Sequence, residues 1–183
     1  MEIYGGRVDD IPEFVQLIKD ESKKLTQEFG QVQLIPFSIY ITSNMDDFNE
    51  KAKGPVPEWG IAVAIMKPDR IIMKAPGIAN ISFTRMKEVV IHELNHIYMF
   101  RLPNYNTIPS WFKEGMAMRS SNEFSLLHKI EISQFIWKKQ ILPLSRLINI
   151  SPYSRDKVKL AYGESAAAIE ALEFYYGENS LLN

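Results

Sequence analysis

The spacing of apolar residues along the chain changes between the period of a helix and the period of a strand. Apolar positions recur at helical spacing from Phe14 to Phe29, and Gly30 follows as an expected stop. The stretch 37–42 instead alternates and is rich in β-branched and aromatic residues, which predicts a strand. The first half of the chain should therefore mix helices with strands.

The remaining pattern predicts a hairpin and then helices only. The apolar runs 60–66 and 70–74 flank the turn Lys67-Pro68-Asp69, so we expect them to pair as a hairpin. Ser82 or Thr84 can cap the helix that follows. The predicted helices span about residues 10–30, 45–51, 82–101, 110–121, 124–138 and 156–176. The expected fold class is α+β, with a small sheet in the first half and a helical second half.

Length and composition are those of an ordinary globular domain. A chain of 183 residues that is 46% hydrophobic can bury a core without disulfides. We expect a single domain, residues 1–183, with an N-terminal lobe of about 1–101 and a helical C-terminal lobe of about 102–183. The net charge of -1 provides no strong field for nucleic acid or an anionic membrane, so neither is an expected partner.

The start of the chain shows no signal-peptide pattern. The first six residues lack the basic region and apolar run of a signal peptide. No window approaches the roughly 20 apolar residues of a membrane span, so the chain is expected to be soluble, without an assigned compartment. It stops just after a helical pattern, which fits a domain excised from a longer protein.

The segment HELNH carries the candidate chemistry. His92 and His96 are four residues apart on a predicted helix, so both imidazoles can reach one zinc ion, with Glu93 beside the open position. The chain has no cysteine, so such a site must use histidine and carboxylate ligands. Catalytic zinc keeps three protein ligands, and Glu114 is the candidate for the third. The branch of zinc proteases with a third histidine is excluded, because Leu102 occupies that position.

HELNH followed by the segment 109–117 resembles the gluzincin group of metallopeptidases, where the glutamate of a W-x-x-E-G-x-A segment is the third zinc ligand. The segments 141–147 and 161–165, and the order of the strands, resemble peptidase MA-like domains of bacteria and archaea. The resemblance runs from about residue 10 to the end and implies a zincin-like fold. The roles that it implies are zinc ligation by His92, His96 and Glu114, general-base catalysis by Glu93, and an oxyanion hydrogen bond from Tyr162.

The resemblance also implies a peptide or protein substrate. In this class the strand nearest the active helix is an edge strand, to which an extended peptide can add as another strand. The stretch 59–66 would be that edge. Gluzincin aminopeptidases carry a glutamate just past this strand to hold the substrate's amine, whereas Met66-Lys67-Pro68 follows here. Dedicated aminopeptidase activity is therefore disfavoured.

The expected function is zinc-dependent hydrolysis of peptide bonds. A zinc ion would lower the pKa of its water to about 7, and Glu93 would take the proton. Two other classes remain open: a weakly active or inactive zinc-binding module that holds a peptide or protein partner, and a metal-stabilised structural domain of a larger protein. Glu93 argues against both, because neither needs a general base beside the ligands.

Each assigned residue also has a structural interpretation. Glu114 could be an ordinary glutamate on a helix surface, and Tyr162 could be a core residue, since tyrosine is common in this chain. His128 has no histidine or carboxylate at ligand spacing, so we expect a structural or surface role for it. Trp111 and Phe112 are expected to be core residues that hold the helix carrying Glu114.

Overall fold

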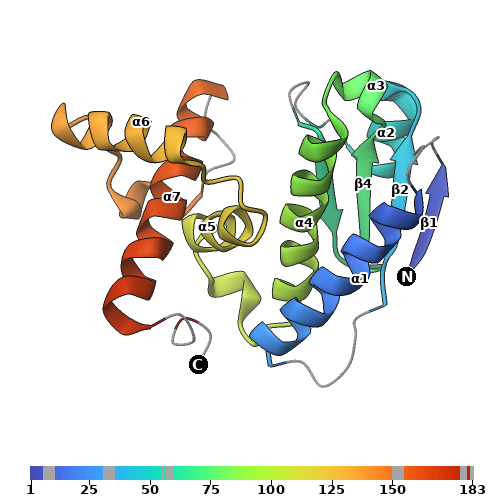
Figure 1. Cartoon of the computed structure of the whole chain (residues 1–183), viewed down its shortest axis with the longest axis horizontal. Coiled ribbons are helices and arrows are strands. Elements are labelled where there is room, and N and C mark those ends of the chain that lie inside the picture. The colour runs from blue at the N-terminus through green and yellow to red at the C-terminus, as the bar shows by residue number, and fades with distance from the viewer. Residues whose placement is uncertain are drawn as a thin grey trace. The chain divides into compact units, whose positions relative to one another are not determined.

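The computed structural model describes residues 1–5, 11–30, 36–54, 56, 60–149, 155–177 and 181. The chain divides into two compact units, Met1–Leu102 and Pro103–Asn183. Within the described residues, the strands all belong to the first unit (Figure 1). This mixture of a four-stranded sheet with helices confirms the α+β class predicted from the sequence.

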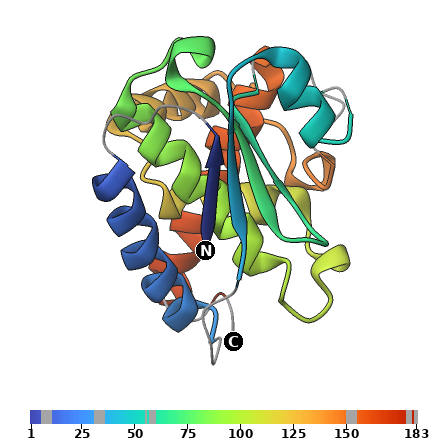
Figure 2. The ribbon, with the colours of Figure 1, turned by 90° about the vertical axis from the view of Figure 1, so that its right-hand side faces the viewer.

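The first unit contains the sheet and the helix that carries HELNH. Its helices are α1 (Ile11–Glu28), α2 (Met45–Lys51), α3 (Pro76–Ala79) and α4 (Phe83–Met99). Its strands are β1 (Glu2–Gly5), β2 (Ser38–Thr42), β3 (Ala62–Ile65) and β4 (Arg70–Lys74). The order across the sheet is β1-β2-β4-β3, and Figure 2 shows the strands side by side, with α1 beside them in blue.

Strand β4 is a central strand, and β3 is an edge strand. Strand β4 pairs in parallel with β2, where Ile71 lies opposite Ile39, and antiparallel with β3, where Ile71 lies opposite Ala64. This antiparallel pair is the hairpin predicted from the sequence. Residues 71–74 of β4 are all buried, which explains the continuous apolar run in the sequence.

Helix α4 packs against β3 and β4, and α1 packs against α4 (Figure 1). Helix α4 carries an apolar stripe at helical spacing, and none of its four side chains is exposed to solvent. These residues are Met86, Val90, Leu94 and Ile97. Burial of four such side chains contributes on the order of 1.5–3 kcal/mol each, so this stripe fixes which face of α4 remains for chemistry.

Two short elements of this unit, β1 and α3, were missed by the sequence analysis. Strand β1 has only four residues, mostly exposed, and exists because it pairs in parallel with β2. Its last residue, Gly5, has φ +77°, and a Cβ there would lie 2.4 Å from the Ile41 carbonyl oxygen. Hydrophobic periodicity cannot report such a strand, because its pairing partner lies more than thirty residues away.

The second unit is built on one long helix. Its elements are the 3₁₀ helices η1 (Tyr105–Thr107) and η2 (Leu144–Arg146) and the α-helices α5 (Ser110–Ser120), α6 (Leu126–Trp137) and α7 (Arg155–Tyr176). Helices α5 and α6 both pack against α7. The three α-helices agree with the predicted spans, whereas the two 3₁₀ helices were not predicted. None of the helices that the structure describes has both the length and the apolar character needed to cross a membrane.

Candidate metal centre

Helix α4 presents the two motif histidines on one side. Ser82 caps the helix, because its side-chain oxygen accepts a hydrogen bond from the Arg85 backbone N–H at 3.1 Å. The ring centroids of His92 and His96 are 5.0 Å apart, and the ring planes meet at 67°. The spacing of four residues therefore brings both rings to the same side of α4, as the sequence predicts.

The motif residues differ in burial. His92 and Glu93 are each 9% exposed, whereas His96 is more accessible. Asn95, between the two histidines, is fully buried. His92 and Glu93 thus lie away from bulk solvent, where charge interactions are stronger than they are in water.

Contacts with α1 hold α4 in place within the first unit. The buried Tyr98, two residues beyond His96, donates its hydroxyl to the Ser22 carbonyl oxygen of α1 at 2.9 Å. Lys87 forms an ion pair of 2.9 Å with Glu13 of α1. A partly exposed ion pair is worth little, so the buried tyrosine contributes more to the stability of this contact than the ion pair does.

Glu114 lies in the middle of α5 in the second unit. Backbone N–H groups in the first turn of this helix find hydrogen-bond partners in a neighbouring loop. The Ser110 N–H donates to the Ile148 carbonyl oxygen and the Trp111 N–H to the Leu147 carbonyl oxygen, both at 3.1 Å. Residues 115–118, directly after Glu114, are all buried. Glu114 itself is partly exposed as a residue, although its carboxylate oxygen Oε2 is buried.

Two neighbours of Glu114 interact with each other. The Lys113 ammonium lies 4.0 Å from the centroid of the Tyr105 ring, within the range of a cation–π interaction. Burial raises the pKa of Tyr105, and the negative charge of Glu114 raises it further. Burial lowers the pKa of Lys113, while Glu114 acts in the opposite direction. Burial and the Glu114 charge both favour the neutral form of the Tyr105 hydroxyl.

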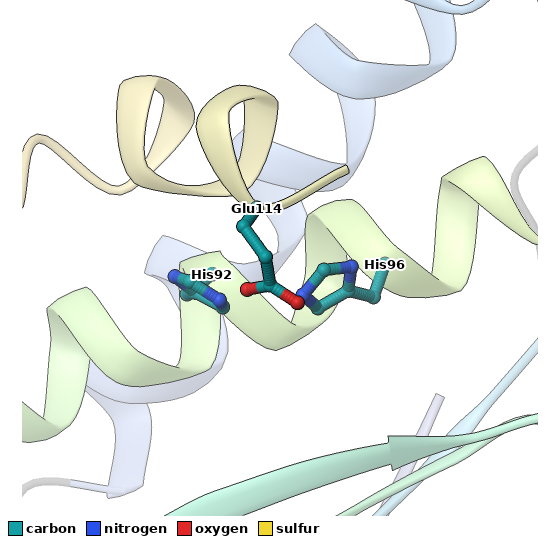
Figure 3. A group of neighbouring side chains, drawn as sticks. All are labelled: His92, His96 and Glu114. Carbon is teal, nitrogen blue, oxygen red and sulfur yellow. The ribbon is translucent and has the colours of Figure 1, made fainter. Parts of the chain in front are cut away.

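His92, His96 and Glu114 form a group of neighbouring side chains that could hold a metal ion (Figure 3). One ligand atom from each residue, a ring nitrogen or a carboxylate oxygen, lies within 4.8 Å of the other two. Among the described residues this is the one group of three or more histidine and acidic side chains that could hold a metal ion. Two imidazole nitrogens and one carboxylate oxygen form a donor set that suits zinc.

Tyr162 lies on α7 and is partly buried. Its side chain packs against two hydrophobic clusters of the second unit. The first consists of Met118, Phe124, Ile132 and Ala166, and the second of Leu147, Val158 and Ala161. The ring therefore has a packing role, and the hydrogen bond from its hydroxyl to an oxyanion stays a prediction.

His128 does not belong to the metal-binding group. Its Nδ1 lies 3.0 Å from the Ser125 hydroxyl at the start of α6, and its ring stacks near Phe124 with centroids 6.4 Å apart. The residue is exposed. These contacts agree with the structural or surface role expected from the sequence.

Glu164 is a buried carboxyl group to which the sequence analysis gave no role. It is 7% exposed, and its Oε1 accepts a hydrogen bond from the Leu142 N–H at 2.8 Å. Its buried Oε2 has no hydrogen-bond partner in the part of the chain that the structure describes. Burial raises the pKa of this carboxyl, and the Leu142 hydrogen bond offsets part of the rise. The sequence signal that could have indicated this burial is the position of Glu164 three residues after Ala161, on the apolar side of a helix.

Replacing Glu164 by glutamine should change how the free energy of unfolding depends on pH. Because the folded state raises the pKa, the stability that this group contributes is complete below the ordinary carboxyl range and is lost as the pH rises through the raised pKa. Glu164→Gln keeps an oxygen for Leu142 but cannot ionise. It should gain stability relative to the parent as the pH rises above the ordinary carboxyl pKa of about 4, measured by urea unfolding at several pH values. A stability difference independent of pH would contradict this.

Comparison with family models gives a match that covers most of the chain. The family model described as the Peptidase MA superfamily matches residues 18–183. The matched range includes both histidines of HELNH, Glu93 and Glu114. Searches of curated proteins and of solved structures found no significant match.

Proposed function

The chain belongs to the Peptidase MA superfamily, and on this basis we propose that it is a zinc-dependent peptidase with His92, His96 and Glu114 as the metal ligands. The observation that carries the proposal is the close approach of two imidazole nitrogens and one carboxylate oxygen. Catalytic zinc sites typically have three protein ligands and one open position. This group supplies that number of ligands.

The chemistry of the donor set supports zinc over other common ions. Calcium and magnesium prefer sites made of oxygen ligands, whereas imidazole nitrogen suits zinc and other transition metals. A structural zinc site would instead be closed by four protein ligands. Among the described residues the group has three, which supports a catalytic site.

In the proposed reaction Glu93 is the general base. A zinc ion at this site would polarise the substrate carbonyl and lower the pKa of water. Glu93, directly after His92 on α4, would take the proton from the attacking water and pass it to the leaving amine. Its burial reduces competition from bulk water for that proton.

Two further elements would serve the substrate. Tyr162 would donate its hydroxyl hydrogen to the oxyanion that forms on the carbonyl, a contact that strengthens as the charge develops. Strand β3 is an edge of the sheet and packs beside α4, so an extended peptide could pair with its free backbone groups. The substrate class is therefore a peptide or an extended protein segment.

The proposal is tested by measuring zinc in the purified protein. We expect one zinc per chain, and His96→Ala should reduce the zinc content to less than about a tenth, because two remaining ligands hold zinc weakly. Elemental analysis after mild dialysis measures this. His128→Ala is the matched control, since this histidine lies on α6 outside the group, and it should bind zinc like the parent. Equal zinc content in His96→Ala and the parent would overturn the ligand assignment.

A further inference from the structure

Helix α5 approaches the backbone of α7 closely at Gly115, the residue after Glu114. A Cβ atom at Gly115 would lie 2.5 Å from the Ser165 backbone oxygen and 2.6 Å from the Ile169 Cγ1. The first of these atoms belongs to the α7 backbone, so a rotamer change cannot relieve the clash. Glycine destabilises a helix interior relative to alanine, which means that its presence here needs a packing reason.

Gly115 is the middle of three contacts that join α5 to α7. One turn earlier, Trp111 packs against the cluster that contains Ala161 of α7. One turn later, Arg119 forms an ion pair with Glu173 of α7. The three contacts follow the same order along both helices, so α5 cannot slide or rotate on α7 without disturbing all of them.

The position of Glu114 depends on this packing. Consecutive residues of a helix point about 100° apart, so Glu114 leaves α5 beside the contact line on which Gly115 lies. Its carboxylate therefore moves with any shift or rotation of α5. Metal sites keep ligand distances to within about 0.2 Å, which is far less than the displacement that an added methyl group would force.

We propose that Gly115 is a positioning residue: it lets α5 lie directly on the α7 backbone and so fixes the point from which Glu114 reaches the metal. This inference rests on the proposed function, in which Glu114 is a zinc ligand. It also assigns a role to the Ser165 region of α7, whose backbone oxygen forms the surface that α5 contacts. Substitution of a residue that holds a metal ligand in place typically costs about 10- to 100-fold in metal affinity.

The test compares two glycine-to-alanine variants within the second unit. Gly163 of α7 faces α6, where a Cβ would meet only the end of the Ile132 side chain, at 2.8 Å from its Cδ1. Gly115→Ala should raise the zinc Kd by about 10- to 100-fold, whereas Gly163→Ala should leave it within about 2-fold of the parent. Competition with a chromophoric chelator measures the Kd, at a temperature where circular dichroism shows both variants folded. Equal Kd values in the two variants would overturn the inference.

A double-variant cycle separates this inference from the proposed function. Glu114→Gln alone should weaken zinc binding, and adding Gly115→Ala should then cause no further loss, because Gly115 acts through Glu114. Unchanged zinc binding in Glu114→Gln would overturn the ligand role itself. If Glu114→Gln weakens binding and Gly115→Ala adds its full effect independently, the ligand role stands and the positioning role fails.

A second pair of variants covers the case in which Gly115→Ala does not fold. Ile169→Ala removes the α7 side chain over Gly115 without adding an atom, and Ile132→Ala makes the same truncation on α6. Both isoleucines are buried, so the two variants should lose similar stability. Ile169→Ala should raise the zinc Kd about 3-fold or more relative to Ile132→Ala. The same Kd in both would contradict the proposal.

Discussion

Glu93→Gln should retain zinc and the fold but lose peptide hydrolysis by several orders of magnitude. A general base alone typically contributes about 10²- to 10⁴-fold, and the amide cannot take a proton from the attacking water. The side chain keeps its size and remains hydrogen-bonding, so the buried position should tolerate it. Single-turnover assays on a peptide that the parent cleaves, together with elemental analysis, measure both properties.

The matched control is Glu88→Gln on the same helix. Glu88 is partly exposed and forms an ion pair of 2.9 Å with Arg85, so its replacement should leave turnover unchanged. Full activity in Glu93→Gln would place the hydrolytic site elsewhere in the chain. Absence of hydrolysis by the parent across a broad peptide library would instead favour the binding-module hypothesis.

The helices of this protein could be predicted because their signals are local. On α4, a cap at Ser82 and an apolar stripe at helical spacing fix both the start of the helix and its buried face. The same stripe determines that His92 and His96 share the other side. The histidine pair and its orientation therefore follow from about twenty consecutive residues.

What could not be predicted depends on distant contacts. Strand β1 exists through pairing with β2, and Gly115 matters because α7, fifty residues later, passes beside it. The buried environment of Glu164 likewise comes from Leu142 in a separate loop. Periodicity assigns a residue to a face of its own helix, but it does not say which backbone covers that face.

Glu114 stands between these two cases. Its place on a helix could be predicted from the surrounding pattern, and its ligand role came from the resemblance of the W-x-x-E-G-x-A segment. Its carboxylate belongs to the group that could hold a metal ion, and the ligand role stays a prediction. Eighteen residues separate it from His96, and no local rule relates two helices at that distance.

Tyr162→Phe should lower kcat by about 10- to 1,000-fold while leaving KM and zinc content little changed. A lost oxyanion donor removes stabilisation that exists only in the transition state, so substrate affinity is spared. The phenylalanine ring can still pack against the two clusters that surround Tyr162, so the variant removes the hydroxyl and little else. Steady-state kinetics and a zinc measurement on the same preparation separate the two effects.

Tyr175→Phe provides the matched control for the role of Tyr162, because Tyr175 lies exposed near the end of the same helix and should not affect turnover.

The competing hypothesis is that Tyr162 serves only to pack against its two hydrophobic clusters, and it predicts a different result. If Tyr162→Phe keeps the kcat of the parent while Tyr162→Ala lowers the melting temperature, the residue acts only through packing. Loss of a fully buried ring of that size typically costs about 3–5 kcal/mol, so loss of this partly buried ring should cost less but remain detectable by thermal unfolding. If Tyr162→Phe lowers kcat without lowering the melting temperature, the lost hydroxyl accounts for the loss of activity.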